Sequence, residues 1–373
     1  MKWWKAPWLQ KIFSPQVTVI CLGFLFVLTF WGTLYQVDHG LHAAQVRFFQ
    51  SYIILLGGFI PFPGAQLVLG VLLLNVLGYT LNLVFFEPLR VGILTMHLGI
   101  LILLLGGAII RYHAEEGYLS LWEGEGSNVA SSYTDWELAV LGGTGAVKQV
   151  TATDVDASVT GDSLRFDPPG LTLSVDAFFP NARAFTSPDA DIPWRSSAGI
   201  SRIEPTRQEL DPVQNVAGAI LTVTKPDQST EQLVLFGEDA LPITIGDTTY
   251  TLALRHRRMP LPLYLTLLDF QRVMHPGTEV AREFSSQVEV SADGSARILT
   301  ISMNKPLRHR GFTLFQQSYQ ELPNGAQSST FAVAKNYGRL LPYYSTGIIV
   351  LGMILHFGQM LVQRARRNTR RGA

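Results

Sequence analysis

Two of the eight histidines in this chain of 373 residues lie inside long apolar segments. His97 is near the start of "TMHLGILILLLGGAII" (Thr95–Ile110), and His356 lies within "PYYSTGIIVLGMILHFGQMLV" (Pro342–Val362). An imidazole in hydrocarbon is costly without a partner, so an intramembrane histidine is a candidate functional residue. Its neutral ring can give a lone pair to a metal ion, or it can hydrogen-bond a neighbouring helix. The residues alone leave both roles open and favour packing at both positions.

The other side chains give weaker signals. The remaining histidines lie outside the apolar segments, at His39, His42, His113, His256, His275 and His309. Two basic clusters, Arg255–Met259 and Leu307–Arg310, could bind carboxylates, which arginine recognises well, although a solvated strand edge is the commoner explanation. The glycine-rich stretch Leu141–Val147 is interpreted as a hairpin turn. No GxSxG, HExxH, P-loop or dinucleotide-binding pattern occurs, so the sequence predicts no enzyme active site of these classes.

The composition is typical of a membrane protein. Hydrophobic residues make up 47% of the chain and charged residues only 16%, which is unusual for a soluble protein. The 29 basic and 29 acidic residues cancel, so net charge favours neither nucleic acid nor an acidic partner. Cys21 is the single cysteine, which excludes an internal disulfide, a CxxC motif and a cysteine-based zinc site. We therefore expect any thiol chemistry to belong to another polypeptide.

Four apolar segments reach the length of about 20 residues that a membrane-crossing helix needs. They are Val17–Gln36, Gly64–Phe86, Val91–Tyr112 and Pro342–Val362. The apolar stretch Ser51–Gly64 is too short to span, so an interfacial helix or re-entrant segment is expected at about residues 41–63. Lysines before the first span and arginines after the fourth predict that both termini are cytoplasmic. The prediction therefore comprises a cytoplasmic N-terminus (1–16), three spans within 17–112, a fourth span (342–362) and a basic cytoplasmic tail (363–373).

The long segment between the third and fourth spans, residues 113–341, has a different pattern. Short runs such as "LTLSVDAF", "YTLALRH" and "SQVEVS" are separated by Gly, Pro, Asp and Asn, and no helical period persists. This pattern predicts a large extracytoplasmic all-β domain, either a sandwich or an open barrel. A hairpin is expected to turn at Lys225–Asp227, and Phe179–Val213, which contains prolines, is expected to be an irregular loop.

Several motifs occur in order along the chain. The first span ends with Gly32, Thr33 and Gln36, and the third begins His97-Leu-Gly99 and leads into "GYLSLWEGEGSN" (Gly117–Asn128). The β-rich segment contains Asp269, Phe270, Pro276, Gly277, Thr278, Phe284 and Ser286. The strongest signature comprises Met303–Leu307, Gly311, Phe312 and Phe315–Tyr319, and Gly338 precedes the fourth span. Together, these motifs and the layout of spans resemble the ResB-like family of cytochrome c biogenesis proteins.

The resemblance implies a subunit of the system II pathway, which carries haem outward across the bacterial cytoplasmic membrane and attaches it to apocytochrome c. It implies a separate CcsA-type partner, because this chain lacks the tryptophan-rich haem-handling loop, and a thioredoxin-like protein to reduce the substrate thiols. Haem b would be bound in transit within the lipid membrane, with no role for nucleic acid. The chain is not expected to be catalytic alone, but to be a subunit of a cytochrome c synthase (haem lyase) complex.

In this family, a histidine in a span of the ResB-type subunit is implied to ligate haem, and His97 is the residue that matches. It is expected one to two turns from the cytoplasmic surface, where Gly99, Gly106 and Gly107 would let a helix or a flat porphyrin approach closely. His356 is expected at a similar depth, so a second axial ligand is geometrically possible there, although no family motif marks it. The competing interpretation is a cofactor-free, membrane-anchored β-domain that acts as an assembly or structural module.

Overall fold

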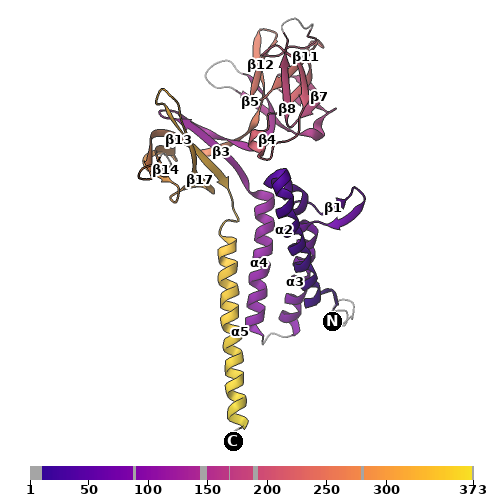
Figure 1. Ribbon diagram of the computed structural model, residues 1–373, viewed down its shortest axis with the longest axis vertical. Helices are drawn as coiled ribbons and strands as arrows, with labels where there is room; N and C mark the ends of the chain where they lie inside the picture. The colour runs from indigo at the N-terminus through magenta and orange to yellow at the C-terminus, as the bar shows by residue number, and fades with distance from the viewer. Residues whose placement is uncertain are drawn as a thin grey trace. The chain divides into compact units, whose positions relative to one another are not determined.

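The computed structural model describes residues 11–86, 90–142, 149–167, 169–187, 192–278 and 281–371. It divides into two compact units, one formed by Met1–Glu115 with Asn336–Ala373 and one by Glu116–Lys335 (Figure 1). Most of the turn predicted at Leu141–Val147 and of the predicted N-terminal segment lies outside the described residues. The two units are helical and β-rich respectively, as the sequence predicted.

The first unit contains four long apolar helices. They are α2 (Pro15–Ala44, continued by the π-helix η2, Gln45–Phe49), α3 (Ala65–Phe86), α4 (Val91–His113) and α5 (Leu341–Arg371). Each is long and apolar enough to cross a membrane, and each matches one of the four predicted spans, with α3 beginning one residue later than predicted.

Residues 41–63 differ from the prediction. The helical part ends at Phe49, after a break at Gly40, whose φ is 81°. Strands β1 (Ile53–Leu56) and β2 (Ile60–Pro63) then form an antiparallel hairpin. Gly57 and Gly58 close the turn at φ of 59° and 86°, a region that glycine enters without steric cost. The glycines and the two prolines of β2 do not suit a helix, and this is why the apolar stretch folds as strands instead.

Helices α4 and α5 pack closely through glycine. Gly92, Gly99 and Gly106 recur every seven residues on α4, and each faces α5. A Cβ atom at Gly99 would lie 2.6 Å from Cγ1 of Ile349, and one at Gly106 would lie 2.9 Å from Cβ of Leu341. Small residues at this spacing let two helix backbones approach. Helix α5 therefore fills the space beside Gly99 and Gly106 that the sequence left open to either a helix or a porphyrin.

The second unit is all-β, as predicted. Its strands are β3 (Glu115–Trp122), β4 (Gly126–Gly142), β5 (Gln149–Val155), β6 (Ser163–Phe166), β7 (Leu171–Phe179), β8 (Ala182–Thr186), β9 (Ile200–Pro205), β10 (Gly218–Thr224), β11 (Thr230–Phe236), β12 (Asp239–Ile245), β13 (Thr248–Met274), β14 (Ala281–Ala292), β15 (Ser295–Ser302), β16 (Leu307–His309), β17 (Phe312–Glu321) and β18 (Gln327–Lys335). Among the described residues, the largest sheet has the order β15-β14-β13-β4-β3-β18-β17-β16, with β12 and β5 added to β13 and β4. A second sheet has the order β11-β10-β7-β6. The sheets are not closed.

Two local predictions have different outcomes. Strands β10 and β11 form the hairpin expected around Lys225–Asp227, where the Lys225 N–H donates to the Ser229 carbonyl at 2.9 Å. The loop expected over Phe179–Val213 is wrong in part, because β8 and β9 pair within it. Ile200 and Ile203 bury against Val234, and this packing across distant positions stabilises two short strands that local pattern did not reveal.

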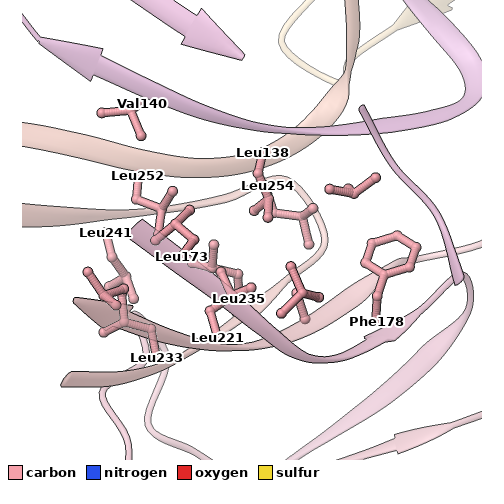
Figure 2. Close-up of a cluster of buried hydrophobic side chains, with 14 of the residues drawn as sticks. Leu138, Val140, Leu173, Phe178, Leu221, Leu233, Leu235, Leu241, Leu252 and Leu254 are labelled. Carbon is pink, nitrogen blue, oxygen red and sulfur yellow. The ribbon is translucent and has the colours of Figure 1, made fainter. Parts of the chain in front are cut away.

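Strands β4 and β13 run through two separate hydrophobic cores. One core packs the second sheet against the C-terminal part of β4 and the N-terminal part of β13. Figure 2 shows Leu138, Leu173, Leu221 and Leu252 converging in this core. The other packs β13, β14, β17 and β18 against one another around side chains such as Leu265. The pairing of β4 with β13 is interrupted at two register shifts between these cores. Because each of these two long strands contributes residues to both cores, the strands join the cores into one unit.

The second core changes from apolar to polar along its length. Beyond the leucines lies a buried layer in which the Ser286 hydroxyl donates to Gln316 Oε1 at 2.7 Å and the Gln316 amide donates to Ser329 Oγ at 2.7 Å. An aromatic layer follows, in which the ring centroids of Phe270 and Tyr319 lie 4.9 Å apart and those of Phe284 and Tyr319 lie 5.5 Å apart. These side chains come from the segments that carry the sequence signature.

We predict that Gly99→Leu weakens the α4–α5 packing by about 1–3 kcal/mol, because the new side chain meets the α5 backbone as well as Ile349. Gly107→Leu is the matched control on the same helix, since no described atom lies within 4 Å of a Cβ there. Thermal unfolding of the purified protein in detergent checks the prediction. Equal melting temperatures for the two variants would contradict it.

We also predict that Gln316→Ala destabilises the β unit by about 1–3 kcal/mol, because it leaves the buried hydroxyls of Ser286 and Ser329 without their amide partner. Gln320→Ala, at an exposed position of the same strand, should change stability by less than about 0.5 kcal/mol. Denaturant titration followed by tryptophan fluorescence measures both. A Gln316→Ala midpoint equal to that of the control would show that the polar layer contributes no net stability.

Candidate functional site

His97 is held in α4 by a backbone hydrogen bond. Its Nδ1 atom lies 2.9 Å from the carbonyl oxygen of Ile93, one turn earlier in the helix. A carbonyl oxygen only accepts, so Nδ1 carries the proton and Nε2 keeps the lone pair of the neutral ring. Histidines that ligate metals usually donate their other ring N–H to a carbonyl or carboxylate in this way. The ring of His97 therefore has the tautomer that ligation through Nε2 requires.

His97 lines a cavity of about 340 Å³. The walls come from the start of α2 with the residues before it, from α3 and from α4: Phe13, Ser14, Pro15, Thr18, Val19, Asn75, Val76, Tyr79 and His97. The ring of Tyr79 lies against that of His97, with centroids 5.0 Å apart and planes at 39°. Such a cavity is at the small end of the range of about 300–1,000 Å³ for ligand sites.

Asn75 sets the position of α2 beside this cavity. Its amide donates to the Ile12 carbonyl at 2.6 Å and to the Ser14 carbonyl at 3.2 Å, and its Oδ1 accepts from the Thr18 hydroxyl at 2.7 Å. The side chain is only 3% exposed, so these bonds are shielded from solvent. They fix the beginning of α2 next to α3. Sequence analysis missed Asn75 and Tyr79, although a polar residue inside an apolar span was a signal that could have revealed Asn75.

His356 lies elsewhere in the helical unit. Its backbone and Cβ are the nearest atoms to Gly92 of α4, and its ring packs on Phe357 with centroids 5.6 Å apart. Gly92 and His97 are five residues apart, which separates their directions by about 140° around the helix. His356 is not among the described residues that line the His97 cavity. The structure therefore brings His97 together with Tyr79 rather than with the second intramembrane histidine.

The basic clusters of the β unit already have acidic partners. Arg255 donates to Glu137 at 2.7 Å, and Arg257 pairs with Asp135 at 2.6 Å. Arg310 is likewise bonded to Asp293. Within the described ranges, no group of three or more histidine, cysteine, aspartate or glutamate side chains is placed to hold a metal ion. Arg255 and Glu137 are only 16% and 6% exposed and face each other across the paired strands β13 and β4, so the expected solvated strand edge is wrong for Arg255. Arg257 and Arg310 form more exposed ion pairs.

His256 is buried where the pairing of β4 with β13 is interrupted. It is the strand partner of Trp136, and the two rings lie 4.1 Å apart. Its Nδ1 is buried and has no hydrogen-bond partner within the described part of the chain. Burial, more than the neighbouring Arg258, lowers the pKa of His256, while Glu238 and Asp135 oppose the shift. The neutral ring is therefore the form that the folded unit favours.

We predict that stability falls on acidification because of His256. Its folded pKa is below the ordinary value of 6.5, so below pH 6.5 the unfolded chain takes up a proton that the folded chain does not. The loss begins as pH falls through 6.5, reaches at most about 1.4 kcal/mol per pH unit and ends at the folded pKa. His256→Phe should flatten the pH dependence of unfolding, whereas His275→Gln, at an exposed position, should not. Identical pH profiles for both variants would refute this role.

No curated protein shows significant similarity to the chain. Residues 237–343 match the model of the ResB-like family. The match includes Phe270, Ser286, Gln316 and Tyr319, the residues whose side chains form the buried polar and aromatic layers. It indicates a role in cytochrome c biogenesis, and four apolar helices are consistent with a membrane protein. The resemblance of this chain to the ResB-like family is thereby confirmed over residues 237–343.

Proposed function

We propose that this chain is the ResB-type membrane subunit of a complex that moves haem across the bacterial cytoplasmic membrane and presents it to apocytochrome c. The observation that carries the proposal is the His97 ring, whose Nδ1–H donates to the Ile93 carbonyl while Nε2 keeps its lone pair beside a cavity. Imidazole nitrogen is a common axial ligand of haem iron, and haem supplies the vinyl chemistry of attachment when bound. The family match indicates the pathway.

Each residue of the cavity has a distinct task in this proposal. His97 would hold the iron through Nε2, and the Ile93 carbonyl would keep the ring from rotating. The ring of Tyr79 would pack against the imidazole and limit its movement. Asn75 would hold the start of α2 at the edge of the cavity. The donor set therefore fits a neutral nitrogen ligand to iron. A cavity of about 340 Å³ can enclose only part of a large planar ligand, which supports a second polypeptide covering the rest.

The remaining tasks fall to partners of the kinds that the resemblance implies. A CcsA-type protein would supply the haem-handling loop and a second ligand for the iron. His356 is a weaker candidate for that ligand, because it lies on α5 and contacts α4 at Gly92, on a different face of α4 from His97. Cys21 is buried among the helices, so a thioredoxin-like protein would keep the apocytochrome thiols reduced. The chain alone would not be the synthase.

The orientation of the helices supports the proposed topology. The neighbours of Gly92 and Gly106 on α5 are His356 and Leu341, so the two helices run antiparallel. The start of α4, next to Arg90, and the end of α5, next to Arg364, are therefore at the same end of the helical unit. Basic residues favour the cytoplasmic side. We place both termini there, with the β unit on the outer face.

The proposal predicts the absorption spectrum of the complex purified with its CcsA-type partner. His97→Gly should remove most of the haem Soret absorbance, and imidazole added to the buffer should restore part of it by entering the space left by the side chain. His356→Gly is the matched control, because it carries the same cost of about 1 kcal/mol for glycine in a helix.

Two other outcomes would decide against the proposal. Wild-type Soret absorbance in His97→Gly, at equal protein level, would return His97 to a packing role. A colourless wild-type complex would favour the alternative of a cofactor-free, membrane-anchored β-domain acting as an assembly module.

A further inference from the structure

The hairpin β1–β2 carries an exposed apolar surface that the haem-handling proposal does not use. Ile53 is 58% exposed, Leu55 54% and Phe59, at the turn, 77%. The opposite face is covered, since Ile54 is 4% exposed and packs with Phe62 in the helical core. A large exposed apolar surface marks a site of contact with a partner or a membrane. The hairpin is thus held by the helices on one face and lacks a partner on the other.

The prolines of β2 remove the donors that would otherwise point outward from the hairpin. In the ladder, Pro61 pairs with Leu55 and Pro63 with Ile53, alternating with the pairs Ile54–Phe62 and Leu56–Ile60. Residues of hydrogen-bonded pairs turn N–H and C=O toward the partner strand, and residues of the intervening pairs turn them away. Proline cannot donate, so its two pairs are the non-bonded ones. The outer edge of β2 therefore lacks N–H groups at both outward positions.

An edge without donors suits apolar surroundings. Each unsatisfied backbone group costs several kcal/mol in hydrocarbon, and open sheet edges are excluded from its centre. Proline at outward positions lowers that cost along β2, while the outward N–H groups of Ile53 and Leu55 on β1 still need water or lipid headgroups. The hairpin therefore matches the interface between headgroups and acyl chains, rather than either bulk water or the bilayer centre.

The surroundings of the hairpin point to the same depth. From Ser51 to Phe86, the chain contains no charged residue. At the base of the hairpin, the hydroxyls of Tyr52 and Tyr112 lie 3.1 Å apart and Arg111 donates to Gln50 at 2.9 Å. Tyrosine and arginine gather where a span meets the interface. Figure 1 shows the hairpin projecting sideways from helices α2 and α3 in the helical unit.

We propose that β1–β2 is a membrane-anchoring wedge whose exposed face, Ile53, Leu55 and Phe59, inserts into the interfacial region of the same bilayer that the helices cross. Its occupant is lipid, because the exposed face is apolar, the segment from Ser51 to Phe86 carries no charge, and tyrosine and arginine lie at the base of the hairpin. The wedge does not depend on haem binding. Burial of the Phe59 ring among lipids stabilises the hairpin tip in the interfacial region. The outward N–H groups of β1, which need water or headgroups, keep the hairpin from entering the bilayer centre.

The test uses an environment-sensitive fluorophore on Phe59→Cys in the full chain with Cys21→Ala, reconstituted in phosphatidylcholine–phosphatidylglycerol vesicles. Spin-labelled lipids carry the quencher either near the headgroup or near the end of the acyl chain, and iodide serves as the aqueous quencher. We expect the shallow lipid quencher to act about twofold more strongly than the deep one, with little quenching by iodide.

Two matched sites calibrate the measurement. Ile354→Cys lies at an exposed position of α5 and should respond best to the deep quencher, while Thr230→Cys lies at an exposed position of the β unit and should respond to iodide. If Phe59→Cys behaves like Thr230→Cys, or is shielded from every quencher as in a protein contact, the proposal is wrong. If Cys21→Ala fails to fold, Cys21 can be retained in the Phe59→Cys variant. The signal from label on the buried Cys21 is then measured in the wild-type chain and subtracted.

Discussion

Hydrocarbon offers polar groups no hydrogen-bond partner, and the helical unit is organised by this constraint. Threonines within the apolar helices return their hydroxyls to carbonyls of their own helix, as Thr29 does to Leu25 and Thr95 to Val91. Asn75 uses its whole amide to tie α3 to the start of α2. His97 is also bonded within its own helix, since its ring N–H donates to the Ile93 carbonyl. Nε2 keeps its lone pair, and the residue lines a cavity, which is the chemical form that a metal ligand requires.

The β unit is organised differently, because it contains two hydrophobic cores that must be joined into one unit. Strands β4 and β13 do this by length, because each contributes residues to both cores. The matched family segment then defines the end of the second core, where apolar, polar and aromatic layers follow one another. Within this segment, β16 pairs with β17, and Leu307, Phe312 and Leu314 bury their side chains in the second core. The signature residues whose contacts are visible here thus maintain the fold.

Local sequence predicted what local physics determines. The length of apolar runs located all four helices, and alternation located strands such as β7, β13 and β14, because each signal is carried by neighbouring residues. The hairpin at residues 53–63 was missed because its length resembled a short helix, although Gly57, Gly58 and two prolines marked a turn and an edge. Strands β8 and β9 were missed for another reason: they depend on Val234, thirty or more residues away. The partners of His97 and His256 likewise come from distant positions, and one sequence does not show such pairings.

The distribution of glycine around α4 restricts how a haem-handling partner can approach. The face with Gly92, Gly99 and Gly106 is fully used by α5, so neither a porphyrin nor another helix can enter there without displacing it. His97 faces Tyr79 and the start of α2 instead. The Asn75 bonds to Ile12 and Ser14 hold the residues just before α2, and Ser14 itself lines the His97 cavity. On the haem-handling proposal, the buried amide of Asn75 that anchors α2 would also shape the cavity beside His97.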